Sequence, residues 1–252
     1  MTRLDGRVAL VTGASSGIGR ATAHALAARG CRLLLTGRDP ERLQQVADDV
    51  AGVSWVCDLS DPEQTRSLAR SLEDHPAPDL VVHNAGVGLA AAAEATEDAD
   101  LHGVLAVNLL APVGLTRSLL PRMRRRGHGH LVFVTSIAAA LGVPDESAYA
   151  ASKAALSTYA SSLRGELTGT GILVTTVAPG VVSTDFFRRR GQPYRRRFPR
   201  PVPAERVAVA LVRAVERNRA EVVVPAWLRL PVAVHAVAPE AYARLASRWG
   251  AA

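Results

Sequence analysis

The chain of 252 residues is long enough for one domain with a sizeable core, which needs no disulfides to stabilise it. Hydrophobic residues make up 48% and charged residues 21%, an ordinary globular composition that excludes disordered and fibrous proteins. The formal charge is +7, and residues 188–200 alone hold seven arginines and no acid, so the remainder is balanced. Two cysteines exclude a disulfide scaffold and a Cys-rich zinc site. We see no signal peptide or membrane span and expect a soluble cytoplasmic protein.

Short β-branched runs alternate along the chain with longer stretches of helical periodicity. The expected strands are Val8–Thr12, Arg32–Thr36, Ser54–Cys57, Leu80–His83, Leu131–Thr135, Leu173–Val177 and Val222–Val224. The expected helices cover about 18–29, 40–50, 62–73, 98–125, 149–168 and 204–218. Strands that alternate with helices require crossover connections and a parallel sheet covered on both faces. The sequence therefore predicts an α/β protein with a single-domain, doubly wound Rossmann fold, in which helices flank a seven-stranded parallel sheet.

The whole chain, 1–252, is expected to form one dinucleotide-binding domain with a core of about 5–225. A C-terminal extension, about 226–252, follows the last expected strand and is interrupted by prolines. Its final part, Pro239–Trp249, has the pattern of a helix. We expect this extension to pack on the domain or on a partner subunit.

A glycine-rich segment connects the first expected strand directly to the first expected helix. Its residues are Gly13, Ser15, Ser16, Gly17, Ile18 and Gly19. Glycines permit a tight turn and close approach of the backbone, and the following helix N-terminus offers free N–H groups to an anion. The spacing G-x-x-x-G-x-G differs from the common G-x-G-x-x-G fingerprint, so an ordinary strand-to-helix turn is the alternative.

The second expected strand ends at Thr36-Gly37-Arg38. In a doubly wound fold this strand end meets the adenosine ribose, where an arginine accommodates a 2′-phosphate. Arg38 therefore favours NADP(H) over NAD(H), and a surface arginine is the alternative. Asp39 precedes Pro40 and is expected to cap the next helix instead.

Tyr149 and Lys153 lie four residues apart in an expected helix, thirteen residues after Ser136. Residues at i and i+4 share one helix face, so the phenol and the ammonium can serve one site. A nearby cation lowers the pKa of a tyrosine from its ordinary value of about 10. Lys153 is the one lysine among 30 basic residues, whereas a mere surface ion pair could equally use arginine.

The motifs described so far, Ser136 included, and three further sequence features together resemble those of the classical short-chain dehydrogenase/reductase family. The further features are His83-Asn84-Ala85-Gly86, Asn108 and Pro179-Gly180. The resemblance covers about 5–225, and its one departure is His83, where the family commonly has asparagine. That position is usually structural.

The resemblance implies a role for each matching residue. Tyr149 would exchange a proton with the substrate oxygen, Lys153 would hold the nicotinamide ribose, Ser136 would polarise the substrate oxygen, and Asn108 would hold a relay water. The implied cofactor-binding residues are Gly13, Ser15, Ser16, Gly17, Ile18, Gly19, Arg38, Asp58, Leu59, Asn84, Ala85, Gly86, Tyr149, Lys153, Pro179, Gly180, Val182 and Thr184.

These residues predict an NADP(H)-dependent oxidoreductase that interconverts a carbonyl and a secondary alcohol by hydride transfer, acting on an apolar or acyl-type ketone. A non-catalytic NADP(H)-binding sensor or partner-binding module is the alternative. The family usually forms homodimers or homotetramers. No metal is expected because the histidines lack ligand spacing, and His128 and His130 are expected at the surface. A nucleic-acid partner is not expected, because no recognition motif is present.

The arginine-rich segment 188–200 follows the expected nicotinamide end of the site. We expect it to act as a lid and to attract an anionic group, such as a substrate carboxylate, a carrier's phosphate or a membrane surface. A solvated loop is the alternative.

Overall fold

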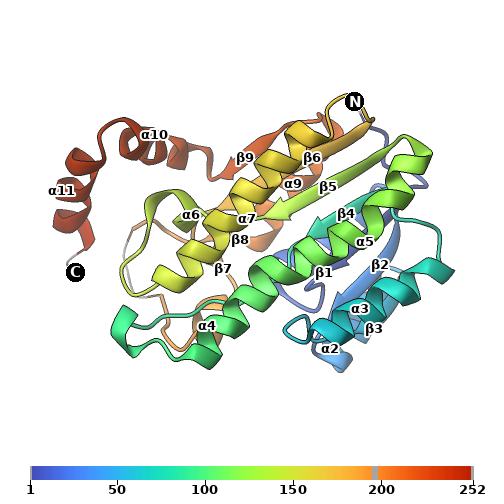
Figure 1. Ribbon diagram of the computed structural model, residues 1–252, viewed down its shortest axis with the longest axis horizontal. Helices are drawn as coiled ribbons and strands as arrows, with labels where there is room; N and C mark the ends of the chain where they lie inside the picture. Colours follow the sequence, from blue (N-terminus) through green and yellow to red (C-terminus); the bar gives the residue numbers. More distant parts are fainter. Residues whose placement is uncertain (1, 195–197, 251–252) are drawn as a thin grey trace.

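Seven parallel strands form one sheet within the part of the chain that the computed structural model describes, which is 2–194 and 198–250, with backbone only for 245–250. Their order is β3-β2-β1-β4-β5-β6-β9 (Figure 1). Their bounds are β1 Val8–Thr12, β2 Arg32–Gly37, β3 Val53–Val56, β4 Leu80–His83, β5 Gly129–Val134, β6 Ile172–Pro179 and β9 Glu221–Val224. The strand order reverses between β1 and β4, which places the ligand crevice of a doubly wound sheet at their carboxyl ends.

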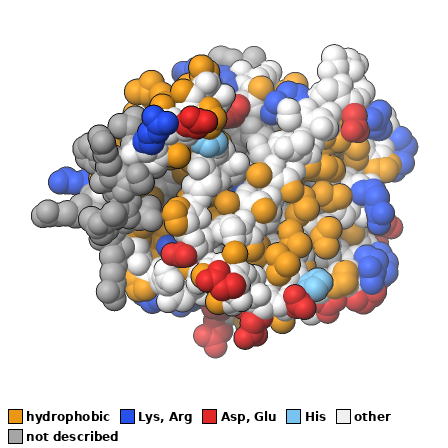
Figure 2. All heavy atoms as spheres, turned by 60° about the vertical axis from the view of Figure 1, so that its left-hand side comes forward, with side chains coloured by type: hydrophobic (Ala, Val, Ile, Leu, Met, Phe, Trp, Pro, Cys, Tyr) orange, Lys and Arg blue, Asp and Glu red, His pale blue; other side chains and the backbone are white. Residues whose placement is uncertain are grey.

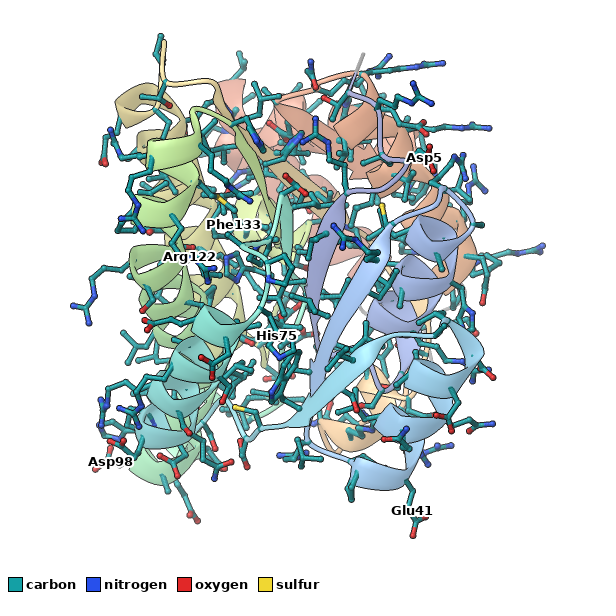
Figure 3. The ribbon with its side chains drawn as sticks, turned by 90° about the vertical axis from the view of Figure 1, so that its right-hand side faces the viewer. Asp5, Glu41, His75, Asp98, Arg122 and Phe133 are labelled. Carbon is teal, nitrogen blue, oxygen red and sulfur yellow. The ribbon has the colours of Figure 1, made fainter. Side chains whose placement is uncertain are left out.

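Helices cover both faces of the sheet, which Figure 3 shows between two helical layers. One layer contains α1 (Gly17–Ala27), α2 (Pro40–Asp49) and α9 (Ala204–Glu216). The other contains α3 (Pro62–Ser71), α4 (Asp98–Leu105), α5 (Ala111–Arg126) and α7 (Ser147–Glu166). This arrangement confirms the doubly wound fold that the alternating pattern predicts.

The core lies on both faces of the sheet because successive strand side chains point in opposite directions. In β5, Leu131 and Phe133 join the cluster on the side of α3, α5 and α7, while Val132 and Val134 join the cluster beneath α1 and α9. Strands that are buried on both faces have nearly continuous apolar sequences. This is why the central strands of the sheet are recognisable from the sequence, whereas the edge strand β3 has no buried residue.

The helix expected over 98–125 is present, but it contains a π-helical turn, Ala106–Leu110, between α4 and α5. Such turns interrupt the regular hydrogen bonding of a helix and are frequent at functional sites. The π-helical turn in this chain contains Asn108, which is 0% exposed. The continuous helix Asp98–Arg126 is long and apolar enough to cross a membrane by length and composition alone, and 44% of its most apolar window is buried inside the fold.

Two expectations about the periphery are wrong or incomplete. His130 is 3% exposed, because β5 begins at Gly129 and carries the imidazole inward, where Nε2 lies 2.8 Å from Thr175 Oγ1. The C-terminal extension contains α10 (Arg229–Val237) before the expected last helix, α11 (Pro239–Gly250). Figure 1 shows α10 and α11 projecting beyond the sheet, and α10 packs beside the short α6 (Ala138–Leu141).

Candidate active site

One large open cavity, of about 2350 Å³, lies at the carboxyl ends of the strands and brings most of the expected site residues together. The expected residues that line it are Gly13, Ser15, Ser16, Gly17, Ile18, Arg38, Asp58, Leu59, Asn84, Ala85, Gly86, Ser136, Tyr149, Lys153, Pro179, Gly180, Val182 and Thr184. Gly19 and Asn108 do not line this cavity but support it from behind. The cavity is large enough to combine a dinucleotide site with an adjoining substrate site.

The glycine-rich turn is held tightly against the loop after β4. Gly13 has a φ of +66°, and a Cβ there would lie 2.9 Å from the Ala85 Cα. A Cβ at Gly19 would lie 2.1 Å from the Gly13 carbonyl oxygen, so a larger residue has no room. The Asn84 side chain donates a hydrogen bond to the Thr12 carbonyl at 2.9 Å. The glycines therefore bring the N-terminus of α1 to the cavity, where its free N–H groups suit an anion.

The adenosine end of the cavity contains Arg38 and Asp58. Burial disfavours ionisation of Asp58, but hydrogen bonds from Ser60 and the nearby charge of Arg38 outweigh it and lower the pKa of that carboxyl. Arg38 is exposed at the end of β2, where its charge can meet a phosphate. Asp39 accepts a hydrogen bond from the Arg42 backbone N–H at 3.1 Å, which confirms that it caps α2.

Lys153 and Asn108 are buried together behind Gly86. A Cβ at Gly86 would lie 3.0 Å from Lys153 Nζ and 3.2 Å from Asn108 Oδ1, which shows how closely the backbone passes. The Asn108 amide donates to the Val87 carbonyl and to Ser152 Oγ, both at 2.9 Å. Because both amide hydrogens are used, the side chain ties the π-helical turn to α7 and to the loop after β4.

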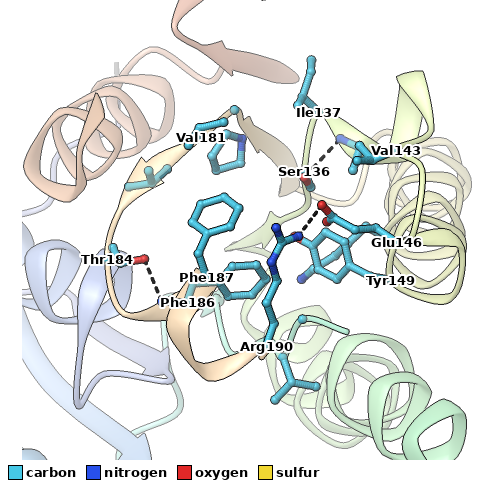
Figure 4. A pocket seen from close by; sticks show the side chains of 18 of the residues that line it. Ser136, Ile137, Val143, Glu146, Tyr149, Val181, Thr184, Phe186, Phe187 and Arg190 are labelled. Atoms are coloured by element: carbon cyan, nitrogen blue, oxygen red, sulfur yellow. Dashed lines mark hydrogen bonds and ion pairs between the residues drawn. The ribbon is translucent and has the colours of Figure 1, made fainter. Parts of the chain in front are cut away.

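Tyr149 projects from the first turns of α7 toward Ser136 at the end of β5 (Figure 4). Burial raises the pKa of Tyr149 to about 12, although a hydrogen bond with Ser136 partly offsets the effect of burial by lowering this pKa. Burial also lowers the pKa of Lys153 to about 8, and its Nζ donates to the Val134 carbonyl at 3.1 Å. The resemblance implies that Lys153 lowers the pKa of Tyr149. In this structure the largest effect on the pKa of Tyr149 is burial, which raises it. The phenol is therefore protonated near neutral pH and can donate a hydrogen bond.

The similarity of this chain to known proteins agrees with this geometry. Residues 7–195 match the family model described as short chain dehydrogenase. The chain belongs to the short-chain dehydrogenase family.

Individual relatives extend the match over nearly the whole chain. An uncharacterized oxidoreductase of Myxococcus xanthus is 37% identical over 247 residues, which is 95% of each chain. The ketoacyl reductase HetN of Nostoc is 33% identical over 266 aligned positions, which cover 99% of this chain and 91% of HetN. A short-chain dehydrogenase/reductase from Burkholderia phymatum, solved in complex with NAD, is 26% identical with a TM-score of 0.83, covering 94% of this chain and 96% of that one.

The departure of this short-chain dehydrogenase from the family motif, His83, is structural. Its imidazole is fully buried and lies 2.9 Å from Thr116 Oγ1, and it stacks on Phe133 at 4.9 Å between ring centroids. Burial lowers the pKa of His83 to about 3, so the ring is neutral. The substitution leaves Asn84 free to hold the glycine-rich turn.

The nicotinamide end of the site is formed by β6 and the segment after it. A Cβ at Gly17 would lie 3.1 Å from Thr184 Cγ2, so this segment crosses closely over the glycine-rich turn. Val182–Ser183 (β7) pairs with Val202–Pro203 (β8) in a small two-stranded sheet that sequence reasoning missed. Strands of two residues carry no periodicity, so no sequence signal was available.

Sequence reasoning assigned Arg190 to the anion-attracting segment 188–200 and missed Glu146, with which it pairs in the substrate wall. Arg190, just after α8 (Phe186–Arg189), forms an ion pair with Glu146, and their side chains are 8% and 13% exposed. Figure 4 shows this pair beside Tyr149 and Phe187. The expected anion-attracting segment is otherwise only partly described, since Arg195, Arg196 and Arg197 lie outside the described residues.

Proposed function

We propose that this protein is an NADP(H)-dependent oxidoreductase that interconverts a carbonyl and a secondary alcohol, with Tyr149 as the general acid and base. The observation that carries the proposal is that Tyr149, Ser136, Lys153 and the glycine-rich turn line one cavity. A protein that only binds a dinucleotide needs the turn but not the buried tyrosine and lysine.

The described residues fit a nicotinamide dinucleotide. The close glycine approach at the N-terminus of α1 suits its pyrophosphate, and Lys153 suits the hydroxyls of its nicotinamide ribose. The bound cofactor supplies hydride transfer, which no side chain can perform. The Burkholderia relative holds NAD, so the fold accepts the cofactor without a 2′-phosphate. Arg38 at the ribose end supports NADP(H) in this chain.

Tyr149 would donate its phenolic proton to the carbonyl oxygen during reduction and take it back during oxidation. Its raised pKa keeps that proton in place near neutral pH. Ser136 lies beside the phenol and would donate a second hydrogen bond to the same oxygen. Asn108 would position Tyr149 indirectly. Its amide donates a hydrogen bond to Ser152, whose hydroxyl donates to the Tyr149 backbone carbonyl at 2.7 Å.

The substrate we propose is an apolar or acyl-type ketone. Beside Tyr149 the cavity wall is built from Ile137, Val143, Val181, Phe186 and Phe187, as Figure 4 shows. The charges of Glu146 and Arg190 in this wall neutralise each other. The relative named as a ketoacyl reductase is consistent with an acyl-type substrate.

A panel of ketones and ketoacyl thioesters, assayed optically with NADPH and with NADH, tests the proposal. We expect turnover of at least one apolar carbonyl, faster with NADPH at low cofactor concentration. A protein that binds NADPH but reduces none of the panel, and whose Tyr149→Phe variant behaves identically in every assay, would favour the non-catalytic sensor.

A further inference from the structure

The short helix α8 reaches two separate parts of the site through adjacent arginines. Arg189 Nη1 donates a hydrogen bond to Ser16 Oγ at 3.2 Å, across 173 positions of the chain. Arg190 pairs instead with Glu146, the N-cap residue of α7. Both arginines line the same cavity as the glycine-rich turn and Tyr149. The segment expected to act as a lid therefore also reaches the glycine-rich turn.

Ser16 marks the place where an anion would sit. It is the N-cap residue of α1, in extended conformation with φ −163° and ψ 169°, yet its side chain caps none of the helix N–H groups. Its hydroxyl instead accepts the hydrogen bond from Arg189. An anion bound at the start of α1 would thus lie within reach of a guanidinium that the opposite side of the cavity supplies.

The ion pairs around Arg189 leave a net positive charge that favours an anionic ligand. Asp185 pairs with Arg188 at 2.6 Å and, at 3.8 Å each, with Arg42 and Arg189. Arg42 also pairs with Asp39 at 3.3 Å, so three guanidinium groups face two carboxylates and one positive charge in this cluster is uncompensated. A pyrophosphate carries two negative charges, and arginine matches phosphate oxygens with paired N–H donors.

Arg190 holds α8 in the position from which Arg189 reaches Ser16. Besides its ion pair with Glu146, Arg190 places its guanidinium carbon 4.6 Å from the centroid of the Phe187 ring. The ring of Phe186 lies 5.5 Å from that of Tyr149. Phe186 at the start of α8 and Arg190 just after its end thus both contact residues at the start of α7, so Arg189 is presented to the cofactor side by a supported element.

We propose that Arg189 binds the pyrophosphate of the nicotinamide cofactor, so that α8 belongs to the cofactor site as well as to the substrate wall. This inference rests on the proposed nicotinamide cofactor and adds a ligand from outside the glycine-rich turn. It differs from the role of Arg38, which faces the ribose end and is expected to recognise only the 2′-phosphate.

Binding titrations with the full chain separate these roles. The probes are NADPH, NADH and ADP-ribose, and the variants are Arg189→Gln, Arg38→Gln and Arg188→Gln, the matched control. Arg188 lies on the same turn and pairs with Asp185, but it is 75% exposed and does not line the cavity. Arg189→Gln should weaken all three probes by roughly tenfold, because each contains the pyrophosphate. Arg38→Gln should weaken NADPH alone, and Arg188→Gln should leave all three dissociation constants within about twofold.

A second measurement, limited proteolysis within 188–200 with and without ADP-ribose, needs no activity. ADP-ribose should slow cleavage in the wild type and protect the Arg189→Gln variant much less. Unchanged affinities in Arg189→Gln, or a loss confined to NADPH, would overturn the inference. If the wild type binds none of the three probes, the proposed cofactor itself is wrong, which is a different outcome.

Discussion

Glu146 and Arg190 form a largely buried ion pair beside the phenol of Tyr149. Tyr149 follows Glu146 by three residues in the sequence. The two charges act on the phenol in opposite directions. Glu146 raises the pKa of Tyr149 and Arg190 lowers it, both weaker effects than that of burial. The pair therefore holds the substrate wall together and also contributes to the acidity of the group that moves the proton.

Removing one charge of this pair should shift the pH dependence of carbonyl reduction. Reduction needs a protonated Tyr149, so its rate falls on the alkaline side as the phenol ionises. Glu146→Gln removes a negative charge and should move this alkaline limb to lower pH, whereas Arg190→Gln should move it to higher pH. The double variant, which loses both charges, should return close to the wild-type profile. Shifts in the same direction for both single variants would contradict the assignment.

Tyr149→Phe should lose carbonyl reduction while keeping the cofactor. Only a hydroxyl is removed, and loss of a general acid costs about 10²–10⁴-fold in rate. Cofactor affinity, measured by titration, should change little, and the unfolding transition should stay cooperative. A variant that retains more than about a tenth of wild-type turnover would exclude Tyr149 as the acid.

Arg38→Asp should reverse the cofactor preference. The change removes a phosphate partner, adds repulsion toward the 2′-phosphate, and supplies an acceptor for a ribose hydroxyl. We expect NADPH affinity to fall by about tenfold or more and NADH affinity to rise. The control is the same substitution at Arg32, an exposed arginine at the other end of β2 (Arg32→Asp). An unchanged ratio of the two dissociation constants would make Arg38 a surface residue.

Lys153 should make the stability of the protein depend on pH between about 8 and 10. Burial lowers its pKa from 10.5 to about 8, so the unfolded chain binds more protons in this window and stability rises with pH. Below pH 8 both states are protonated and the cost of burying the charge is present in full. Lys153→Met should therefore gain stability over the wild type at pH 7.5, and this gain should shrink by about 2 kcal/mol at pH 10. Denaturant unfolding at the two pH values measures this gain in stability. An equal gain at both pH values would show that the pKa of Lys153 is not lowered by burial.

The helices α5 and α7 should form the contact between subunits of a homodimer or homotetramer. Figure 2 shows hydrophobic side chains gathered on this face, and Leu110, just before α5, is 62% exposed. Leu110→Glu should shift sedimentation toward the monomer, because it places a charge in an apolar contact. The control is Val209→Glu, at a 41%-exposed position in α9 on the opposite layer. A wild-type monomer at micromolar concentration would rule out the assembly.

Local patterns in the sequence were sufficient for the sheet and for half of the site. Strand residues buried on both faces leave continuous apolar runs, and Asp39 before Pro40 marks the start of a helix. Tyr149 and Lys153 share a helix face because four residues make about one turn, and that relation needs no tertiary information. The glycine-rich turn is likewise local, since it joins a strand directly to a helix.

The remaining features depend on which segments the folded chain brings together. No pattern within 98–126 predicts the π-helical turn, which Asn108 ties to Ser152 and Val87. His130 looks like a loop residue, but β5 starts at Gly129, two residues before the expected start. His130 is buried because β5 pairs with β6 on one side and β4 on the other. In the same way, Arg189 and Arg190 read as members of a solvated charge run. Only the path of the chain after β7 decides that one meets Ser16 and the other Glu146, because side-chain pairing over such distances is set by tertiary packing rather than by sequence periodicity.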